Sequence, residues 1–416
     1  MINEGTDDVH GYDAENKLEN ICYRLFGKDL VLRSPVLLEE SGEKELTDIL
    51  VLIDDIAIII QSKSMKIDIS DLDEKKLQRI INRQNKAIKQ INTALNAEKR
   101  KTNVKALTPF DVSFKLDWSR IKHKIGIITL SISDDEYNDP EFRFQYPHLA
   151  EAHKGIEIHT FLLNDLEQMV KEISTPADML LYLSCRYKCV ISNKFIIPNE
   201  LDFLGFYKIQ YPELKFILES TQSPPAYIHP GYWEEYRDAH KEKIIDRNQK
   251  FRDSYPYDSI LRALVTGVNY SVEKHSYTSE ESAFNYMLMI GKLSKVTRME
   301  RAEIGRKLKA KYEKTKNHRY GYFLFINHQY KIAYLFLVVN EKDRGKRVNA
   351  LTNLCEEAVN NLDGFEQIVG IAMNGAKDNE SSLDTLILED ISEIQCESDF
   401  PVLFKEPKNG LLNEWD

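Results

Sequence analysis

The chain has 416 residues, of which 42% are hydrophobic and 29% charged, and it carries a formal net charge of −10 at pH 7. This length predicts two domains, or three at most, each large enough to bury a core, and the composition is that of an ordinary globular protein. The acidic balance does not indicate a nucleic-acid-binding protein, so any such contact would have to come from local basic surfaces.

No apolar run approaches the length that spans a membrane, and residues 1–11 are polar and acidic. We therefore expect neither a transmembrane helix nor a signal peptide, and no membrane partner. The five cysteines are scattered, and no Cys-x-x-Cys pair occurs among them. This pattern predicts neither a disulfide framework nor a zinc site, and it favours a reducing, cytoplasmic setting.

The first predicted element is a helix over residues 12–26, with apolar side chains at helical spacing and Gly27 at its end. Glu15 and Glu19 lie one turn apart along or beside the apolar stripe, and the simplest interpretation is a solvated acidic edge. A strand is predicted next, over residues 30–38. Its interruption at Ser34-Pro35 is typical of an edge strand or a bulge.

Residues 45–63 hold the pattern around which the rest of the chain is organised. Two apolar, β-branched runs, 49–53 and 56–60, flank Asp54-Asp55 and predict a β-hairpin. Both faces of both strands are apolar, which is typical of strands covered by helices on each side.

The pairing of the two strands predicts a cluster of polar side chains. With the two Asp residues in the turn, Asp48 lies opposite Gln61, and Lys63 points to the same face because side chains alternate along a strand. A carboxylate, an amide and an ammonium group then meet at the open end of an apolar hairpin. Polar groups are costly there unless something binds them.

This arrangement resembles the PD-(D/E)XK nuclease superfamily, in which one hairpin strand carries Asp and the next carries (Asp/Glu/Gln)-x-Lys. Asp48 and Gln61-Ser62-Lys63 match those positions, the Gln resembles the Mrr-type branch, and Thr47 stands where the family has Pro. The order of predicted helices and strands also follows the family over roughly the first half of the chain. The resemblance implies a restriction-endonuclease-like fold, a mixed sheet flanked by helices.

The family's chemistry implies roles for these residues. Asp48 would be the central ligand of a Mg²⁺ ion, with Mn²⁺ as an alternative, and Gln61 would offer a neutral amide oxygen. The first helix would add a carboxylate, from Glu15 or Glu19, with Glu15 fitting the family pattern better. Lys63 would position the attacking water or stabilise developing charge. The alternative is that Asp48 and Lys63 only form an ion pair at a strand end.

A long basic helix is predicted directly after the Gln-x-Lys strand, over residues 72–99. Its charged side chains include Arg83, Lys86 and Lys89. A charge-rich helix face is usually only solvated, but as a group in this place these residues predict a groove that follows a phosphate backbone.

The remaining elements predict three regions. Strands at 124–133 and 156–163, followed by helices to about Pro198, complete an α/β domain over residues 1–198. Residues 199–279 are rich in Pro and aromatic side chains and predict a linker or helical insertion. A second, smaller C-terminal α/β domain is predicted over residues 280–416, from these elements: a helix at 282–316, a hairpin at 320–339, a helix at 348–361, and strands at 367–373 and 383–388.

Few other motifs carry chemistry. Arg306 and Lys309, in the basic half of the helix at 282–316, are candidates for a second nucleic-acid contact, although solvation or an acidic partner would explain them equally well. Gly291-Lys292-Leu293-Ser294 lacks the rest of a phosphate-binding loop. Cys185 and Cys189, at helical spacing, are most simply core residues.

The resemblance thus implies a Mg²⁺-dependent endonuclease that hydrolyses phosphodiester bonds. It favours DNA as the substrate, leaves RNA open, and suggests restriction or anti-phage defence as the setting, with a homo-oligomer or defence-system proteins as partners. The alternative function is a nuclease-like module that binds nucleic acid or a partner protein and cuts weakly or not at all.

Overall fold

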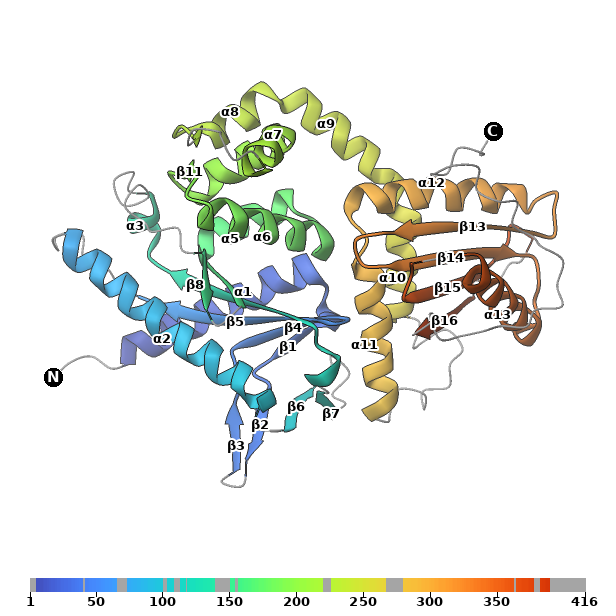
Figure 1. Ribbon diagram of the computed structural model, residues 1–416, viewed down its shortest axis with the longest axis horizontal. Coiled ribbons are helices and arrows are strands. Elements are labelled where there is room, and N and C mark those ends of the chain that lie inside the picture. The colour runs from blue at the N-terminus through green and yellow to red at the C-terminus, as the bar shows by residue number, and fades with distance from the viewer. Residues whose placement is uncertain are drawn as a thin grey trace. The chain divides into compact units, whose positions relative to one another are not determined.

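The computed structural model describes residues 5–39, 42–65, 73–99, 103–107, 113–116, 118–138, 150–153, 156–219, 226–266, 280–362, 364–377 and 382–389. The chain forms two compact units (Figure 1). Unit 1 comprises residues 1–250 and 272–298, and unit 2 comprises residues 251–271 and 299–416. Among the described residues, no helix combines the length and the apolar character needed to cross a membrane.

Unit 1 is built on a six-stranded sheet with the order β1-β4-β5-β8-β10-β9. β4 pairs with β1 and β5 in the antiparallel sense, whereas β5, β8 and β10 are parallel to one another. The mixed α/β fold expected from the sequence is therefore confirmed. The strands are β1 (Val31–Arg33), β4 (Ile49–Ile53), β5 (Ile56–Ser64), β8 (His123–Ser131), β9 (Ala150–His153) and β10 (Ile156–Leu162).

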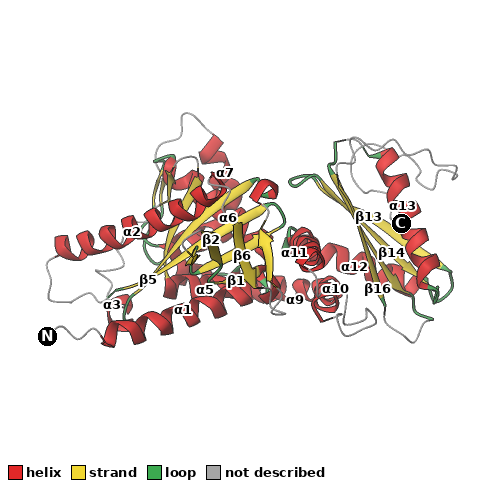
Figure 2. Ribbon diagram, turned by 90° about the horizontal axis from the view of Figure 1, so that it is seen from below, coloured by secondary structure: helices red, strands yellow, loops and turns green. Residues whose placement is uncertain are grey.

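Helices cover both faces of this sheet (Figure 2). α2 (Asp73–Lys99) lies on one face, and α1 (Gly5–Phe26), α5 (Leu163–Glu172) and α6 (Pro176–Ile191) lie on the other. A Cβ on Gly126 would stand 3.2 Å from Ile91 of α2, and Gly126 pairs with Ile59 of β5. Because side chains alternate along a strand, Gln61 and Lys63 also belong to the face that α2 covers.

The predicted hairpin is present with the predicted register: Ile53 pairs with Ile56 and Leu50 pairs with Ile59. Asp54 adopts a positive φ of 57° in the two-residue turn. Every residue of β4 is buried, as the run of β-branched and leucine side chains on both faces requires.

The turn of the hairpin is held by α11 (Glu280–Ser294). Lys292 Nζ lies 2.8 Å from Asp54 Oδ1, and Lys295, just after the helix, lies 2.6 Å from Asp54 Oδ2 and also pairs with Asp55. Gly291 allows the close approach, because a Cβ there would stand 2.3 Å from the backbone nitrogen of Asp54. Both buried carboxylate oxygens of Asp54 are thereby matched with positive charge.

This division of the chain differs from the predicted one at residues 198 and 280. The described residues of 199–250 belong to unit 1 and make polar contacts with Glu172 of α5. Lys208 Nζ donates to the carbonyl of Glu172 at 2.9 Å, and Arg247 Nη2 to its carboxylate at 2.8 Å. The segment contains α7 (Glu200–Glu219), β12 (Ala226–Tyr227), α8 (Tyr232–Ala239) and α9 (Lys241–Lys250), and β12 pairs with β11 (Phe195–Ile196).

Two predicted elements prove to be divided. The strand expected over residues 30–38 breaks at Ser34, whose φ is 42°, so that β1 joins the main sheet and β2 joins a second one. That second sheet, of order β3-β2-β6-β7, was not predicted. Its strands are β2 (Val36–Glu39), β3 (Gly42–Glu45), β6 (Asn103–Leu107) and β7 (Ser113–Leu116).

The single helix expected over residues 282–316 was wrong. α11 ends at Ser294, and α12 (Arg298–Lys314) begins after a break in which Val296 is fully buried. Asp178 accepts a hydrogen bond from the backbone nitrogen of Arg298 at 3.1 Å, which satisfies one amide at the start of the new helix. Shorter elements of unit 1 are η1 (Lys28–Leu30), η2 (Trp118–Arg120) and α3 (Asp134–Asn138).

Unit 2 contains a four-stranded sheet of order β13-β14-β15-β16, in which only β14 and β15 are parallel. One face packs on α13 through a core that includes Leu335, Leu351 and Cys355. On β14, Phe336 contacts Tyr257 of α10, with ring centroids 6.2 Å apart. The elements are η3 (Phe251–Ser254), α10 (Tyr255–Thr266), α12, β13 (Tyr320–Asn327), β14 (Ile332–Val339), α13 (Arg344–Asn361), β15 (Gln367–Asn374) and β16 (Leu383–Glu389).

Candidate metal centre

Asp48 lies immediately before β4, at the open end of the hairpin. Its backbone carbonyl accepts a hydrogen bond from Ser34 at 3.0 Å, and its Oδ2 accepts one from the backbone nitrogen of Ser62 at 2.6 Å. Oδ1 accepts no hydrogen bond from any residue that the structure describes. The carboxylate is thus fixed by one oxygen and has the other available.

Gln61 lies opposite, on β5, and its side chain is almost fully buried. Its Nε2 donates to Thr47 Oγ1 at 3.0 Å, and its Oε1 accepts from Lys63 Nζ at 3.2 Å. Thr47 Oγ1 in turn donates to the carbonyl of Ile60 at 2.7 Å. The amide oxygen therefore points toward Lys63 and the amide nitrogen away from it.

Lys63 donates to Gln61 and to the carbonyl of Ser62, at 2.8 Å. Within the described part of the chain it forms no direct ion pair with Asp48, so the two residues are not simply a strand-end salt bridge. Burial lowers the pKa of Lys63, and the positive charges of Lys86 and Arg83 on α2 lower it further, against the attraction of Asp48 and Glu15. These groups therefore share one electrostatic environment.

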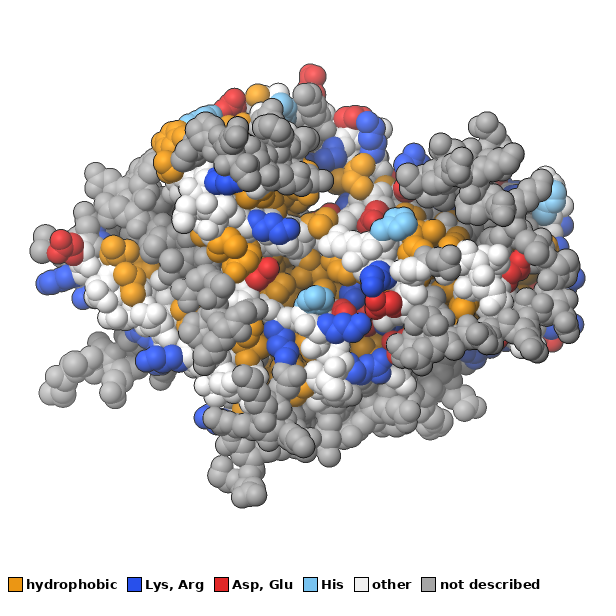
Figure 3. Space-filling view, viewed as in Figure 1, with side chains coloured by type: hydrophobic (Ala, Val, Ile, Leu, Met, Phe, Trp, Pro, Cys, Tyr) orange, Lys and Arg blue, Asp and Glu red, His pale blue; other side chains and the backbone are white. Residues whose placement is uncertain are grey.

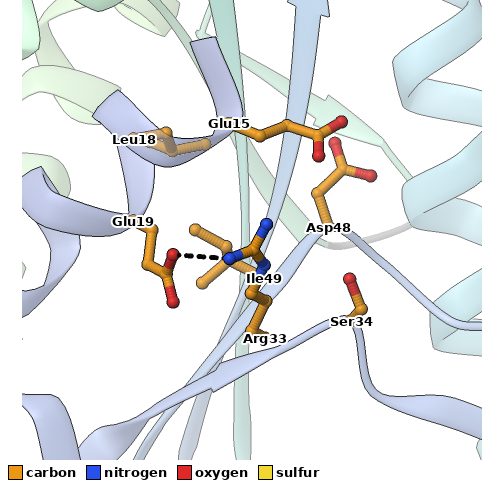
Figure 4. A pocket seen from close by; sticks show the side chains of 7 residues that line it. All are labelled: Glu15, Leu18, Glu19, Arg33, Ser34, Asp48 and Ile49. Carbon is orange, nitrogen blue, oxygen red and sulfur yellow. Dashed lines mark hydrogen bonds and ion pairs between the residues drawn. The ribbon is translucent and has the colours of Figure 1, made fainter. Parts of the chain in front are cut away.

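The two glutamates of α1 have different surroundings (Figure 4). Glu15 points its carboxylate at that of Asp48, and both line a small open hollow. Glu19 is engaged elsewhere: Arg33 Nη1 donates to it at 2.9 Å, and the Tyr23 hydroxyl also donates to it. The helix carboxylate that faces Asp48 is therefore Glu15, and Glu19 holds Arg33 at the side of the hollow.

Burial has the largest effect on the pKa of Asp48, and the neighbouring acids add to it. Burial raises its pKa from 3.8 to about 6, and the nearby negative charges of Glu15 and Glu45 add to the rise. The Ser62 amide and Lys63 oppose it without cancelling it. Glu15 makes no hydrogen bond or ion pair with any described residue. A cation between the two facing carboxylates would reduce the repulsion between their negative charges.

The donor atoms suit a hard divalent ion. Asp48 and Glu15 offer carboxylate oxygens and Gln61 offers an amide oxygen, and no sulfur or imidazole ligand is among them. Among the described residues, no group of three or more His, Cys, Asp or Glu side chains could hold a metal on its own. Mg²⁺ commonly takes only one or two carboxylates and completes its coordination with water and substrate oxygens, so this partial set fits it.

The predicted basic residues of α2 are exposed. Arg83, Lys86 and Lys89 all lie on the solvent side of the helix, as their spacing suggested. Between them and the sheet lies Gln84, which is 1% exposed and whose two amide atoms have no hydrogen-bond partner among the described residues. This buried, unpaired amide was not foreseen, because a lone Gln in a helical pattern gives no sign of burial.

Other predicted residues are distributed over both units. Arg306 and Lys309 lie exposed on α12 of unit 2, and Arg306 stands 3.7 Å from Asp253. Cys185 and Cys189 are buried and free, as expected of core residues.

Sequence reasoning missed three residues that shape the site. Thr47 accepts a hydrogen bond from Gln61 and orients it, and Arg33 donates a hydrogen bond to Glu19. Glu45 adds negative charge near Asp48. Thr47 offered a signal, since it replaces the proline that the resemblance leads one to expect. Arg33 and Glu45 lie on strands whose pairing depends on tertiary structure, and their spacing alone did not reveal them.

Comparison with known proteins adds no assignment. No family model, no curated protein and no solved structure matches this chain.

Proposed function

We propose that the protein is a metal-dependent endonuclease of the PD-(D/E)XK type, which hydrolyses phosphodiester bonds in DNA. The observation that carries the proposal is the meeting of Asp48, Glu15, Gln61 and Lys63 at the open end of one buried hairpin, with two carboxylates facing each other. Cytoplasmic action in restriction or antiviral defence is the setting that the resemblance suggests. A homo-oligomer or defence-system proteins are the partners it suggests.

The ligands for Mg²⁺ or Mn²⁺ would be Asp48 and Glu15, with the amide oxygen of Gln61 as a third. A divalent ion there would supply charge neutralisation at the phosphate and a more acidic bound water. Hydrogen bonds within the chain hold these oxygens in place. The backbone nitrogen of Ser62 donates to Asp48, and the hydroxyl of Thr47 accepts from the amide of Gln61.

Lys63 would act on the scissile phosphate or on the attacking water. It is half-buried, and its side chain is held by Gln61 and the Ser62 carbonyl, so little side-chain freedom remains to be lost on substrate binding. Its lowered pKa lies closer to neutrality than that of an exposed lysine. A fixed ammonium group here would stabilise negative charge that develops during hydrolysis.

The exposed face of α2 would contact the phosphate backbone. Between residues 74 and 96 this helix has six Lys or Arg residues and a single acid, Glu74, in a chain whose net charge is −10. On the face drawn in Figure 3, basic side chains lie among acidic and apolar ones rather than in one continuous surface. The positive charges of Arg83 and Lys86 on α2 also lower the pKa of Lys63. Arg306 and Lys309 would give a second contact.

The test compares two glutamates on the same helix. Purified protein is incubated with plasmid DNA and Mg²⁺ or Mn²⁺, and so are Asp48→Ala, Lys63→Met, Glu15→Gln and Glu19→Gln. We expect cleavage to be lost in the first three variants and retained in Glu19→Gln, because Glu19 is occupied by Arg33 and Tyr23. Cleavage that survives Asp48→Ala and Lys63→Met would remove the assignment. A parallel incubation with single-stranded RNA distinguishes the substrates.

Substrate contact is tested separately from cutting. Asp48→Ala protein is titrated with duplex DNA in EDTA over a range of salt concentrations. Charge reversal at Arg83 and Lys86 should reduce the slope of log affinity against log salt by about 0.9 for each phosphate that the protein no longer neutralises. Lys241→Glu, at an exposed position of α9, is the matched control and should leave the slope unchanged.

One observation favours a second function, binding without efficient cleavage. Lys63 already donates a hydrogen bond to the amide oxygen of Gln61 that a metal would need. Binding to duplex DNA with no cutting in Mg²⁺, Mn²⁺ or Co²⁺ would favour this alternative over the nuclease.

A further inference from the structure

Thr47 is buried, and its single hydroxyl makes two hydrogen bonds. It donates its only proton to the carbonyl of Ile60 at 2.7 Å and accepts from Gln61 Nε2 at 3.0 Å. A hydroxyl has one proton and two lone pairs, so toward Gln61 it presents a lone pair and nothing else.

This fixes which end of the Gln61 amide faces Lys63. An amide turned by 180° would set its NH₂ group against the Lys63 ammonium and its oxygen against the lone pair of Thr47. Both contacts would be unfavourable, because the first pairs two donors and the second pairs two acceptors. The observed orientation is therefore the one in which the oxygen points toward Lys63.

We propose that Thr47 is a positioning residue that aims the Gln61 carbonyl oxygen as a metal ligand, and that positions 47 and 61 form a matched pair. The proposal rests on the proposed function, since it assigns the orientation of a ligand in that site. One contact links the two residues, because the Thr47 hydroxyl offers an acceptor and the Gln61 amide supplies the donor.

A glutamate at position 61 would not fit beside Thr47. Both its oxygens are acceptors, and they would meet the Thr47 lone pair. If the hydroxyl turned to donate to the carboxylate, it would give up its buried hydrogen bond to the Ile60 carbonyl, which costs free energy. The carboxylate, normally the stronger ligand, should therefore work poorly while Thr47 is present and better once its hydroxyl is removed.

Five proteins test this coupling: wild type, Thr47→Val, Thr47→Ser, Gln61→Glu and the Thr47→Val/Gln61→Glu double variant. Uptake of Mn²⁺ is measured without nucleic acid, from the free-ion signal in electron paramagnetic resonance, and urea unfolding is followed for each protein. Plasmid cleavage against Mg²⁺ concentration gives a second readout. Should Thr47→Val not fold, Thr47→Ala takes its place in both variants.

Removing the hydroxyl should raise the Mn²⁺ concentration for half saturation by about 10–100-fold, the usual effect of losing a group that orients a ligand. Thr47→Ser keeps the hydroxyl, so its Mn²⁺ concentration for half saturation should stay within about threefold of the wild-type value. The double variant should bind Mn²⁺ at least about tenfold more tightly than Gln61→Glu alone.

The outcomes separate the two proposals. If wild type takes up Mn²⁺ and cuts, but Thr47→Val lowers only the stability and leaves half saturation unchanged, Thr47 is merely structural and this inference fails alone. If the effects of Thr47→Val and Gln61→Glu on Mn²⁺ half saturation simply add in the double variant, positions 47 and 61 are not a matched pair and the inference also fails alone. If wild type neither takes up Mn²⁺ nor cuts, the metal site itself is wrong and the inference falls with it.

Discussion

Replacing Asp48 by Asn should make unit 1 more stable when no divalent metal is present. The pKa of Asp48 rises from 3.8 to about 6 on folding, because the carboxylate is buried and faces Glu15. Each pKa unit corresponds to about 1.4 kcal/mol, so ionised Asp48 costs the folded state about 3 kcal/mol at neutral pH. The Asn side chain carries no charge and keeps an oxygen for the Ser62 amide, so a gain of about 1–3 kcal/mol is expected once partial solvent screening is allowed for.

The gain has a defined pH dependence. The folded state holds the Asp48 proton more tightly than the unfolded state, so the cost is fully present above the folded pKa of about 6. It declines as the pH falls through the window between about 6 and 3.8 and vanishes below it. The difference between Asp48→Asn and wild type should therefore be largest at about pH 7 and close to zero at about pH 3.5.

Urea unfolding monitored by tryptophan fluorescence measures this difference, because Trp118 and Trp233 both lie buried in unit 1. Titrations are run in EDTA and repeated with Mg²⁺. Mg²⁺ at about 100 times its dissociation constant should stabilise wild type by about 2.7 kcal/mol and leave Asp48→Asn unchanged, so the gap should close or reverse. An Asn variant that is less stable than wild type in EDTA, or a gap independent of pH, would refute the reasoning.

Three further substitutions can be measured in the same unfolding assay. Lys292→Met leaves buried Asp54 short of one cation and should cost about 3 kcal/mol. Although burial opposes it, Lys295 and Lys292 hold the pKa of Asp54 below 3.8, so this cost should shrink as the pH falls below that value. Gly291→Ala brings a Cβ to 2.3 Å from the Asp54 nitrogen and should destabilise by about 1–3 kcal/mol. Gln84→Leu removes an unpaired buried amide and should stabilise by about 1–3 kcal/mol, whereas exposed Gln78→Leu should change stability by less than about 0.5 kcal/mol.

The hairpin was predictable because the residue pattern of its strands and turn agrees with the burial of its strands in the fold. Two β-branched runs around a pair of Asp residues leave one plausible turn, and the burial of both faces leaves one register. The alternation of side chains then brought Asp48, Gln61 and Lys63 to one end of the strands without any tertiary information.

The spacing of Glu15 and Glu19 did not decide between them, although the resemblance favoured Glu15. Their spacing on α1 is compatible with either role, and the decision is made by Arg33, which reaches Glu19 from β1. The second sheet was missed for a different reason: all four residues of β3 are exposed, so this strand has no apolar alternation to read. The division between α11 and α12 likewise depends on a contact from a distant helix, the bond from Arg298 to Asp178.

The two ends of the hairpin pose the same physical problem and solve it differently. At the turn, buried Asp54 has both oxygens matched by Lys292 and Lys295, and its pKa falls despite its burial. At the open end, Asp48 forms no ion pair with any described residue, and burial raises its pKa, with Glu15 adding to the rise and Lys63 opposing it. Two lysines neutralise the buried Asp54 carboxylate at the turn, whereas no comparable pair of lysines contacts Asp48 among the described residues. The charge left uncompensated beside Asp48 therefore argues for a cation that comes from solution.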